Sequence, residues 1–293
     1  MKIAVIGANG QLGTDLCRVL AHQDMAVVPL LHRDLDVTNV AQVGQILDSI
    51  QADVVISTAA YHKVEECEKQ PALSFAVNAI GPRNLAVACQ RHNSVLVHFS
   101  TDYVFDGQRR EPYTESDLPR PLNVYGVSKL AGEGMIALTW ERSFVIRTCG
   151  LYGVAGSSGK GGNFVETMLE KARDAEMIRV VNDQVLTPTF TGDLAEAVGQ
   201  LIQSKAYGLY HVSAEGQCSW YEFARAILEL GGLEVNLVSV STNEYPSPVQ
   251  RPAYSVLSKA RLNRLGIKMA GWEEGLGRYV IARNKKINAS SPA

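Results

Sequence analysis

The sequence has few cysteines, no strong excess of charge of either sign and no long apolar run. Its five cysteines are scattered at positions 17, 67, 89, 149 and 218 without a Cys-x-x-Cys pair, which disfavours a disulfide scaffold and a zinc ribbon. Lys and Arg total 28 and Asp and Glu total 30, so the net charge of −2 excludes the basic surface of a protein that coats nucleic acid. No segment reaches the roughly 20 apolar residues of a membrane span. We therefore expect a cytoplasmic protein with neither a nucleic-acid nor a membrane partner.

The first half of the sequence alternates short apolar segments with longer amphipathic ones. Strands are expected at 3–6, 26–31, 53–57, 95–99 and 144–147, and helices at 13–21, 40–50, 71–92 and 125–140. Apolar strands without polar alternation, separated by helices, are typical of a parallel sheet that is covered on both faces. The sequence therefore predicts an α/β protein with a Rossmann doubly wound parallel sheet.

The second half is less regular and predicts a smaller, interleaved C-terminal substrate domain. Helices are expected at 164–175, 191–204 and 219–230, and strands at 178–181 and 208–212. The Gly/Ser-rich segment 154–162 is either a flexible surface loop or a loop that covers a ligand. The predicted cofactor domain comprises 1–150 and about 186–206, and the substrate domain about 151–185 and 207–283. The polar residues 284–293 predict a disordered tail.

Three glycines with the spacing G-x-x-G-x-x-G, at Gly7, Gly10 and Gly13, lie between the first strand and the first helix. Glycine allows a tight turn and a close approach of a pyrophosphate to the backbone, and the N-terminus of the helix attracts the anion. The pattern alone is weak, but it occupies the first strand-to-helix turn of a chain with several more such units. It therefore predicts a dinucleotide site.

The end of the second strand usually selects between the two nicotinamide cofactors. An acidic residue there would bind the ribose hydroxyls of NADH, whereas Arg33 in this sequence could bind the 2′-phosphate of NADPH. An exposed Arg33 without a ligand is nearly as reasonable, so NADPH is favoured and NADH stays open. Asp36 either caps the next helix or contacts the adenine.

Tyr125 and Lys129 form a Y-x-x-x-K motif, which places both side chains on one face of a helix. A phenol is a weak acid near neutral pH, and a nearby ammonium group would lower its pKa. Thr101 follows directly on the fourth strand, at the edge of the sheet where open α/β folds bind ligands. Its hydroxyl could bond both a reacting carbonyl oxygen and Tyr125. Together the three residues predict hydride transfer.

Several longer segments strengthen this reading. With these segments the sequence resembles the extended short-chain dehydrogenases/reductases and, among them, the dTDP-4-dehydrorhamnose reductase family. The matching segments are GANGQLG (7–13), DVT (36–38), STDYVFDG (100–107), PLNVYGVSKLAGE (121–133), GNF (162–164), VVNDQ (180–184), SWYEFA (219–224) and RPAYSVL (251–257). The resemblance covers nearly the whole chain and implies reduction of the 4-keto group of a nucleotide-linked 6-deoxy sugar by NADPH or NADH.

The resemblance also implies roles for individual residues. Tyr125 would donate a proton, Thr101 would polarise the carbonyl group, and Lys129 would bind the cofactor. Besides Tyr125 and Lys129, the implied cofactor-binding residues are Gly7, Gly10, Gln11, Leu12, Gly13, Arg33, Asp36, Val37, Ala60, Tyr61 and His62. The implied substrate-binding residues are Thr101, Asp102, Gly150 and Asn163.

Gly150 departs from the family pattern, because relatives usually carry a tryptophan at this position that packs near the sugar. Its absence leaves the identity of the sugar open, or another side chain fills the space. No acidic cluster indicates a metal site, and none is predicted. Two alternative functions remain: an epimerase or dehydratase of nucleotide sugars, or a non-catalytic NADP-binding subunit similar to the regulatory β subunit of methionine adenosyltransferase. Helices 71–92 and 125–140 could form a homodimer face or belong to the core.

Overall fold

The central sheet contains six parallel strands. The computed structural model describes residues 1–156, 162–245 and 247–290. The strands are β1 (Lys2–Ile6), β2 (Ala26–Leu30), β3 (Val54–Ser57), β4 (Val95–Thr101), β5 (Ser143–Thr148) and β10 (Gly208–His211). Their order is β10-β5-β4-β3-β1-β2, so the direction of winding reverses between β1 and β3. In doubly wound sheets, ligands bind at such a reversal, beyond the carboxyl ends of the strands.

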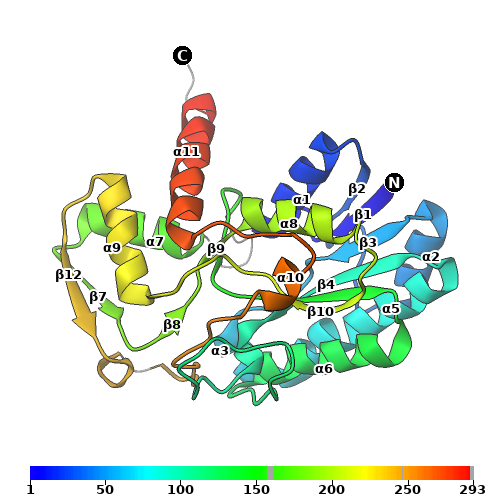
Figure 1. The fold of residues 1–293 in the computed structure, drawn as a ribbon, viewed down its shortest axis with the longest axis horizontal. Coiled ribbons are helices and arrows are strands. Elements are labelled where there is room, and N and C mark those ends of the chain that lie inside the picture. Colours follow the sequence, from blue (N-terminus) through cyan, green and yellow to red (C-terminus); the bar gives the residue numbers. More distant parts are fainter. Residues whose placement is uncertain (157–161, 246, 291–293) are drawn as a thin grey trace.

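Helices cover both faces of this sheet (Figure 1). Helices α1 (Gln11–His22) and α8 (Thr191–Leu201) pack on one face, where alternate strand residues such as Ile3 and Val5 point. Helices α2 (Val40–Ile50), α5 (Gly81–His92) and α6 (Val124–Thr139) cover the other face, which receives Ala4 and Ile6. Because both faces are buried, the strands are apolar throughout, and the predicted Rossmann doubly wound fold is confirmed.

The helix predicted at 71–92 is interrupted. After the short helix α3 (Val64–Lys69), the chain forms α4 (Pro71–Phe75), a π-helical turn (Ala76–Ile80) and then α5. Buried Asn78 lies within the π-helical turn, and its side-chain amide bonds both the backbone N–H and the carbonyl group of Tyr61 at 2.8 and 2.9 Å. Such turns are frequent at functional sites, and this one holds the segment that follows β3.

The remaining elements form a smaller unit beside the sheet. Three two-stranded pairings, β12 with β7, β11 with β8 and β6 with β9, lie next to helices α7, α9 and α11. Its core is largely aromatic, and Tyr152, Phe190, Phe223, Trp272 and Tyr279 pack together there. The elements are β6 (Leu151–Tyr152), α7 (Phe164–Asp174), β7 (Met177–Val181), β8 (Val185–Leu186), β9 (Thr189–Phe190), β11 (Cys218–Ser219), α9 (Trp220–Gly231), β12 (Asn236–Val240), α10 (Ala260–Asn263) and α11 (Trp272–Ser290), with 3-10 turns at Asp102–Val104 and Thr242–Glu244.

Two of the predicted boundaries are wrong. Residues 207–283 were assigned to the substrate domain, but β10 pairs with β5 within the central sheet. Leu262, Ile267 and Met269 also join the core beneath α1 and α8, because the chain returns to the sheet after its long excursion. Residues 284–290, predicted as part of a disordered tail, continue helix α11, and 291–293 lie outside the described residues. Most of the predicted loop 154–162, namely 157–161, also lies outside them.

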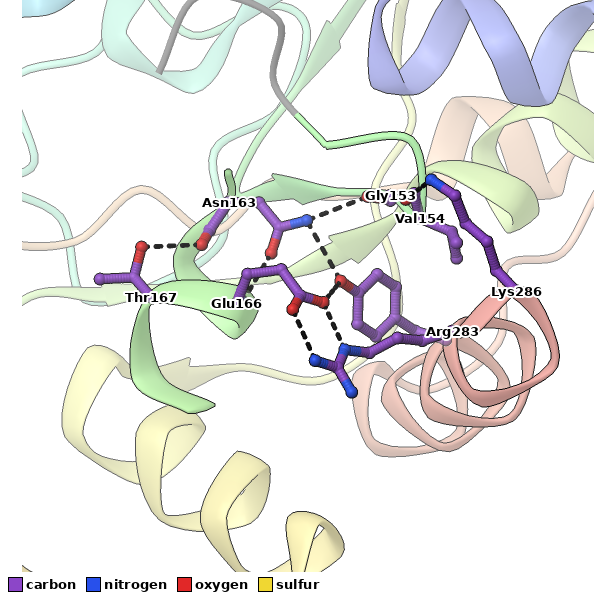
Figure 2. Close-up of polar contacts among 8 residues, drawn as sticks. Gly153, Val154, Asn163, Glu166, Thr167, Arg283 and Lys286 are labelled. Carbon is purple, nitrogen blue, oxygen red and sulfur yellow. Dashed lines mark hydrogen bonds and ion pairs between the residues drawn. The ribbon is translucent and has the colours of Figure 1, made fainter. Parts of the chain in front are cut away.

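Polar contacts explain why α11 continues so far (Figure 2). Arg283 binds both carboxylate oxygens of Glu166 on α7 at 2.6 and 2.8 Å, and the Tyr279 hydroxyl donates to the same carboxylate at 2.5 Å. Lys286 donates to the carbonyl oxygen of Val154 at 3.1 Å. These contacts hold a polar helix whose sequence composition alone indicates disorder. Within the described residues, no helix has the length and apolar character needed to cross a membrane.

We expect Arg283→Met to lower the free energy of unfolding by about 1–2 kcal/mol, because the half-buried Glu166 carboxylate loses a bidentate partner. Urea unfolding measures the change. Lys285→Met on the same helix serves as the matched control. Lys285 is exposed and forms no ion pair among the described residues, so its replacement should change stability by less than about 0.5 kcal/mol. Equal effects of the two substitutions would contradict the role given to the Glu166 contact.

Candidate active site

Two of the three glycines in the turn after β1, Gly7 and Gly13, have no room for a side chain. Gly7 has a φ of +78°, and a Cβ atom there would lie 2.5 Å from Thr58 Oγ1. A Cβ atom at Gly13 would lie 2.2 Å from the carbonyl oxygen of Gly7. Gly10 is the N-cap of α1, and no side chain caps the N–H groups of its first turn. Gly7, Gly10, Gln11, Leu12 and Gly13 therefore form a tight backbone cradle that fits a pyrophosphate.

Gln11 and the segment after β3 flank this cradle. Gln11 Nε2 donates to the carbonyl oxygen of Leu151 at 3.1 Å, while its Oε1 is buried and has no hydrogen-bond partner in the described part of the chain. Ala60, Tyr61 and His62 follow β3, the strand beside β1, and Asn78 fixes their backbone. The predicted cofactor-binding residues from β1 and β3 thus lie at the reversal of the sheet, and an unpartnered amide oxygen there suits a polar ligand.

The residues after β2 are placed differently from one another. The Arg33 side chain is 81% exposed, and its nearest carboxylate, Asp34, is 3.8 Å away. Asp36 accepts hydrogen bonds from the N–H and hydroxyl groups of Thr38 at 2.9 and 2.8 Å, which hold the pKa of its carboxyl group below the usual range. The cap of α2 is Asn39, so the alternative that Asp36 caps this helix is wrong. Val37 is buried against the edge of α5.

Tyr125 lies in the first turn of α6, next to Thr101 at the carboxyl end of β4. Burial of its hydroxyl group raises the pKa of Tyr125, and a hydrogen bond with the Thr101 side chain lowers it; the net direction is upward. The ring of Tyr103 packs edge-on against it at 5.9 Å. The sequence predicts that Lys129 lowers the pKa of Tyr125. In the structure, desolvation of the Tyr125 hydroxyl raises this pKa by more than contacts within the protein lower it. Tyr125 is therefore protonated at neutral pH, as a general acid must be before it donates, and the raised pKa makes it a weaker acid than a free phenol.

Thr101 and Asp102 are both buried and bonded to each other. Thr101 Oγ1 donates to Asp102 Oδ1 at 3.0 Å and accepts from the N–H group of Tyr103 at 3.2 Å. Burial raises the pKa of Asp102 to about 6, against hydrogen bonds with Ser255 and Thr101 that lower it. The hydroxyl proton of Thr101 can thus be shared between Asp102 and Tyr125, which makes the three side chains one continuous hydrogen-bonded chain.

Lys129 lies one helical turn after Tyr125 and is 1% exposed. Its Nζ lies 3.2 Å from His98 Nε2. Burial lowers the pKa of Lys129 to about 8, and the charge of Glu133 counteracts this effect. The Tyr125 and Lys129 side chains therefore share a helix face, as predicted, while the hydrogen bond of the ammonium group goes to a strand residue that the sequence motif does not contain.

Two glycines allow α6 to lie this close to its neighbours. A Cβ atom at Gly126 would lie 2.2 Å from the carbonyl oxygen of Tyr103, and one at Gly132 would lie 2.2 Å from that of Asn78. Ser128, between Tyr125 and Lys129, accepts from Asn78 Nδ2 at 3.0 Å and donates to the carbonyl oxygen of Tyr125 at 2.8 Å. The catalytic helix and the segment after β3 are thus joined through one buried amide.

The comparisons with known proteins agree with this geometry. The family model described as RmlD substrate binding domain matches residues 1–284. The chain belongs to this family. It is 44% identical over 97% of its length, and 98% of the relative's, to the spore coat polysaccharide biosynthesis protein SpsK of Bacillus subtilis. It is 36% identical to a dTDP-4-dehydrorhamnose reductase of Aggregatibacter actinomycetemcomitans, over 94% of this chain and 97% of the relative.

A solved structure resembles this member of the RmlD family closely. The dTDP-4-dehydrorhamnose reductase of Bacillus anthracis, in complex with NADP, has a TM-score of 0.91 and 42% identity over 96% of this chain and 99% of its own. Since the match spans both the sheet and the smaller unit, the two parts described above are arranged as in that reductase. Within the described residues, no cluster of three or more His, Cys, Asp or Glu side chains could hold a metal ion.

Gly150 and Asn163, the two predicted substrate residues outside the sheet edge, are both tied to the backbone of the smaller unit. Gly150 has a φ of +56°, and a Cβ atom there would lie 3.0 Å from Leu186 Cδ1 and from Pro188 Cα. Leu186 and Pro188 thus occupy the space that a larger side chain would enter in this RmlD-family chain. Asn163 caps α7 and donates to the carbonyl oxygen of Gly153 at 3.0 Å (Figure 2). The amide group of Asn163 thus forms hydrogen bonds within the protein, and its contact with substrate stays a prediction.

The motif analysis missed several residues of the site. Arg251 forms an ion pair with Glu65 and a hydrogen bond with Tyr103, which joins the segment RPAYSVL to α3 and to the Thr101 turn. Ser255 in the same segment bonds Asp102. No spacing rule links positions 65, 102, 251 and 255. Arg251 and Ser255 lie in the segment RPAYSVL (251–257), which the family resemblance singles out without giving either residue a role.

The Asp102 carboxyl group should make stability depend on pH. Its pKa in the folded protein, about 6, lies above the ordinary value of 3.8, so the folded state binds the proton more tightly. This contribution is complete below pH 4 and is lost as pH rises through 6, by about 3 kcal/mol in total. Relative to the wild type, Asp102→Asn should therefore become more stable by this amount between pH 4 and pH 7.

Chemical denaturation at intermediate pH values measures this difference. Asp174→Asn, at an exposed position at the end of α7, is the control and should give a flat difference curve. A flat curve for Asp102→Asn as well would show that the carboxyl group is ionised without cost in the folded protein.

Proposed function

We propose that this chain catalyses the NAD(P)H-dependent reduction of dTDP-4-dehydro-L-rhamnose to dTDP-L-rhamnose. The coarser statement, an NAD(P)H-dependent oxidoreductase of the RmlD family acting on a nucleotide-linked keto sugar, follows from its relatives. The observation that carries the proposal is the hydrogen-bonded series Tyr125, Thr101 and Asp102 at the carboxyl edge of the sheet, beside the glycine cradle. A proton donor and a dinucleotide site at one edge are what carbonyl reduction requires.

The reduced nicotinamide supplies the hydride when bound. As the carbonyl carbon of the sugar accepts it, the carbonyl oxygen needs a proton, and the Tyr125 hydroxyl donates one. Thr101 stabilises the resulting phenolate by turning its own hydroxyl proton from Asp102 toward Tyr125. Lys129 adds a positive charge one turn away and would bind the ribose hydroxyls of the cofactor. Burial of Thr101, Asp102 and Lys129 strengthens these interactions because water competes little with them.

Cofactor preference and oligomeric state complete the proposal. The preference for NADPH over NADH rests on Arg33, whose exposed guanidinium group has only a 3.8 Å contact with Asp34 and is free to bind a phosphate. The homodimer also stays a prediction. It is supported by exposed apolar side chains on the helices that the sequence singled out, namely Leu73, Ile80, Val127 and Leu138.

Tyr125→Phe should lower kcat at least about 100-fold, because it removes the proton donor and leaves the shape of the site unchanged. The measurement is the loss of NADPH absorbance with dTDP-4-dehydro-L-rhamnose as substrate. The dissociation constant for NADPH, measured by fluorescence titration, should change less than about threefold. Tyr221→Phe on α9 is the control and should keep wild-type kcat. A wild-type protein that binds NADPH but turns over no dTDP-linked keto sugar would overturn the proposed reaction.

The same assay separates the alternatives. An epimerase or dehydratase would retain tightly bound NAD through purification and would show no net consumption of added NADPH. A non-catalytic subunit would bind NADP and pull down a synthetase without reducing any keto sugar. The complete set of Thr101, Tyr125 and Lys129 favours an enzyme over a non-catalytic subunit, and the segments NVYGVSKLAGE (123–133) and RPAYSVL (251–257) favour the reductase over the epimerase or dehydratase.

Arg33→Ala should raise the KM for NADPH about fivefold and leave the KM for NADH unchanged. The loss of one exposed charge contact with a phosphate corresponds to about 1 kcal/mol, which is the basis of this estimate. Steady-state kinetics with both cofactors measure it, and Arg225→Ala on α9 is the control. An equal effect on both cofactors would assign Arg33 to a part of the cofactor that NADPH and NADH share.

A further inference from the structure

His98 is the direct hydrogen-bond partner of Lys129. It lies on β4, three residues before Thr101, and both His98 and Lys129 are 1% exposed. The distance between Lys129 Nζ and His98 Nε2 is 3.2 Å. An ammonium group donates but cannot accept, so Nε2 carries the lone pair and the ring proton resides on Nδ1. His98 Nδ1 has no hydrogen-bond partner in the described residues.

A carboxylate is near Lys129 but is used elsewhere. Glu133, one turn further along α6, accepts from Arg147 Nε and Nη2 of β5 at 2.9 and 2.7 Å and from Ser100 Oγ at 2.5 Å. Its charge therefore reaches Lys129 only over a distance, where it raises the pKa of the ammonium group. Among the residues that the structure describes, the direct acceptor for this fully buried cation is thus a neutral ring.

His98 remains neutral because of where it lies. Burial and the positive charge of Lys129 both lower its pKa well below the usual value of 6.5. A carboxylate in its place would cancel the positive charge that Tyr125 requires, whereas an imidazole satisfies the ammonium group and leaves the charge intact. Among the described residues, the Nδ1–H group of His98 has no partner, which costs about 1–3 kcal/mol in a buried position. The same ring orientation directs the Nε2 lone pair at Lys129.

We propose that His98 is a positioning residue, whose Nε2 lone pair holds the Lys129 ammonium group in its charged form and in the orientation that binds the cofactor. This inference rests on the proposed function of Lys129. It predicts that loss of the acceptor changes cofactor binding and its pH dependence, rather than the proton donor itself. The groups that set this dependence are His98 on β4, Tyr125 and Glu133 on α6, and Arg147 on β5.

The experiment compares four variants by fluorescence titration with NADPH and by the pH profile of kcat/KM. His98→Leu removes the acceptor. His98→Asn keeps a polar group that is too short to reach Lys129, and it remains informative if the leucine variant does not fold. His98→Gln places an amide oxygen near the position of Nε2. Ser100→Ala is the matched control, because it removes the other polar contact between the same face of β4 and α6.

His98→Leu and His98→Asn should weaken NADPH binding about tenfold or more, the effect of losing one hydrogen bond to a charged group. Without its acceptor, the ammonium group loses its proton more easily, so the alkaline limb of the pH profile should lie about one pH unit lower than in the wild type. His98→Gln should restore both the affinity and the limb, and Ser100→Ala should shift neither.

An unchanged affinity and limb in His98→Asn, or equal shifts in Ser100→Ala, would overturn the proposal, since the latter result indicates a general loosening of α6. Failure of His98→Gln to restore binding would do the same. Because NADPH binding is measured without a sugar, these results can be interpreted even if dTDP-4-dehydro-L-rhamnose is not the substrate. A wild type that binds NADPH and reduces nothing would instead refute the proposed function alone.

Discussion

The close approach of α6 to its neighbours is the constraint on which the site depends. Gly126 and Gly132 let the helix touch the carbonyl oxygens of Tyr103 and Asn78, where any side chain would collide. At this distance the polar residues on the inner face of α6 are cut off from water. They must then find partners within the protein, and Lys129, Glu133 and Ser128 find them on the sheet and in the π-helical turn.

This packing also gives each buried ionisable group a different partner. The Glu133–Arg147 pair is buried and fully bonded, so it fixes α6 against β4 and β5 without adding net charge to the site. The direct partner of Lys129 is a neutral ring, which leaves its positive charge uncancelled, and burial raises the pKa of Asp102 to about 6, so this carboxyl group is mostly ionised at neutral pH. The charge that acts on Tyr125 is therefore that of Asp102, which raises the pKa of the phenol, while the hydrogen bond with Thr101 lowers it.

Much of the sheet could be predicted from the sequence, because apolar strands and the glycine turn are local patterns. Such patterns predict strands β1, β3, β4 and β5. They also predict that Thr101, Tyr125 and Lys129 lie together. The sequence could not predict that β10 returns to the sheet or that α11 extends through residues 284–290. Both depend on distant contacts, with β5 in one case and with Glu166 in the other. The role of His98 was equally hidden, because its partner lies 31 residues away.

The contacts of α11 and Asn163 have a consequence for how this fold can vary. Asn163 bonds Gly153, and Lys286 bonds Val154, so the two ends of the segment between them are joined to each other and to the C-terminal helix (Figure 2). With its ends fixed in this way, the segment can change in length at a small cost in loop-closure entropy. Insertions between residues 154 and 162 would therefore leave the contacts of Gly153, Asn163 and the C-terminal helix in place.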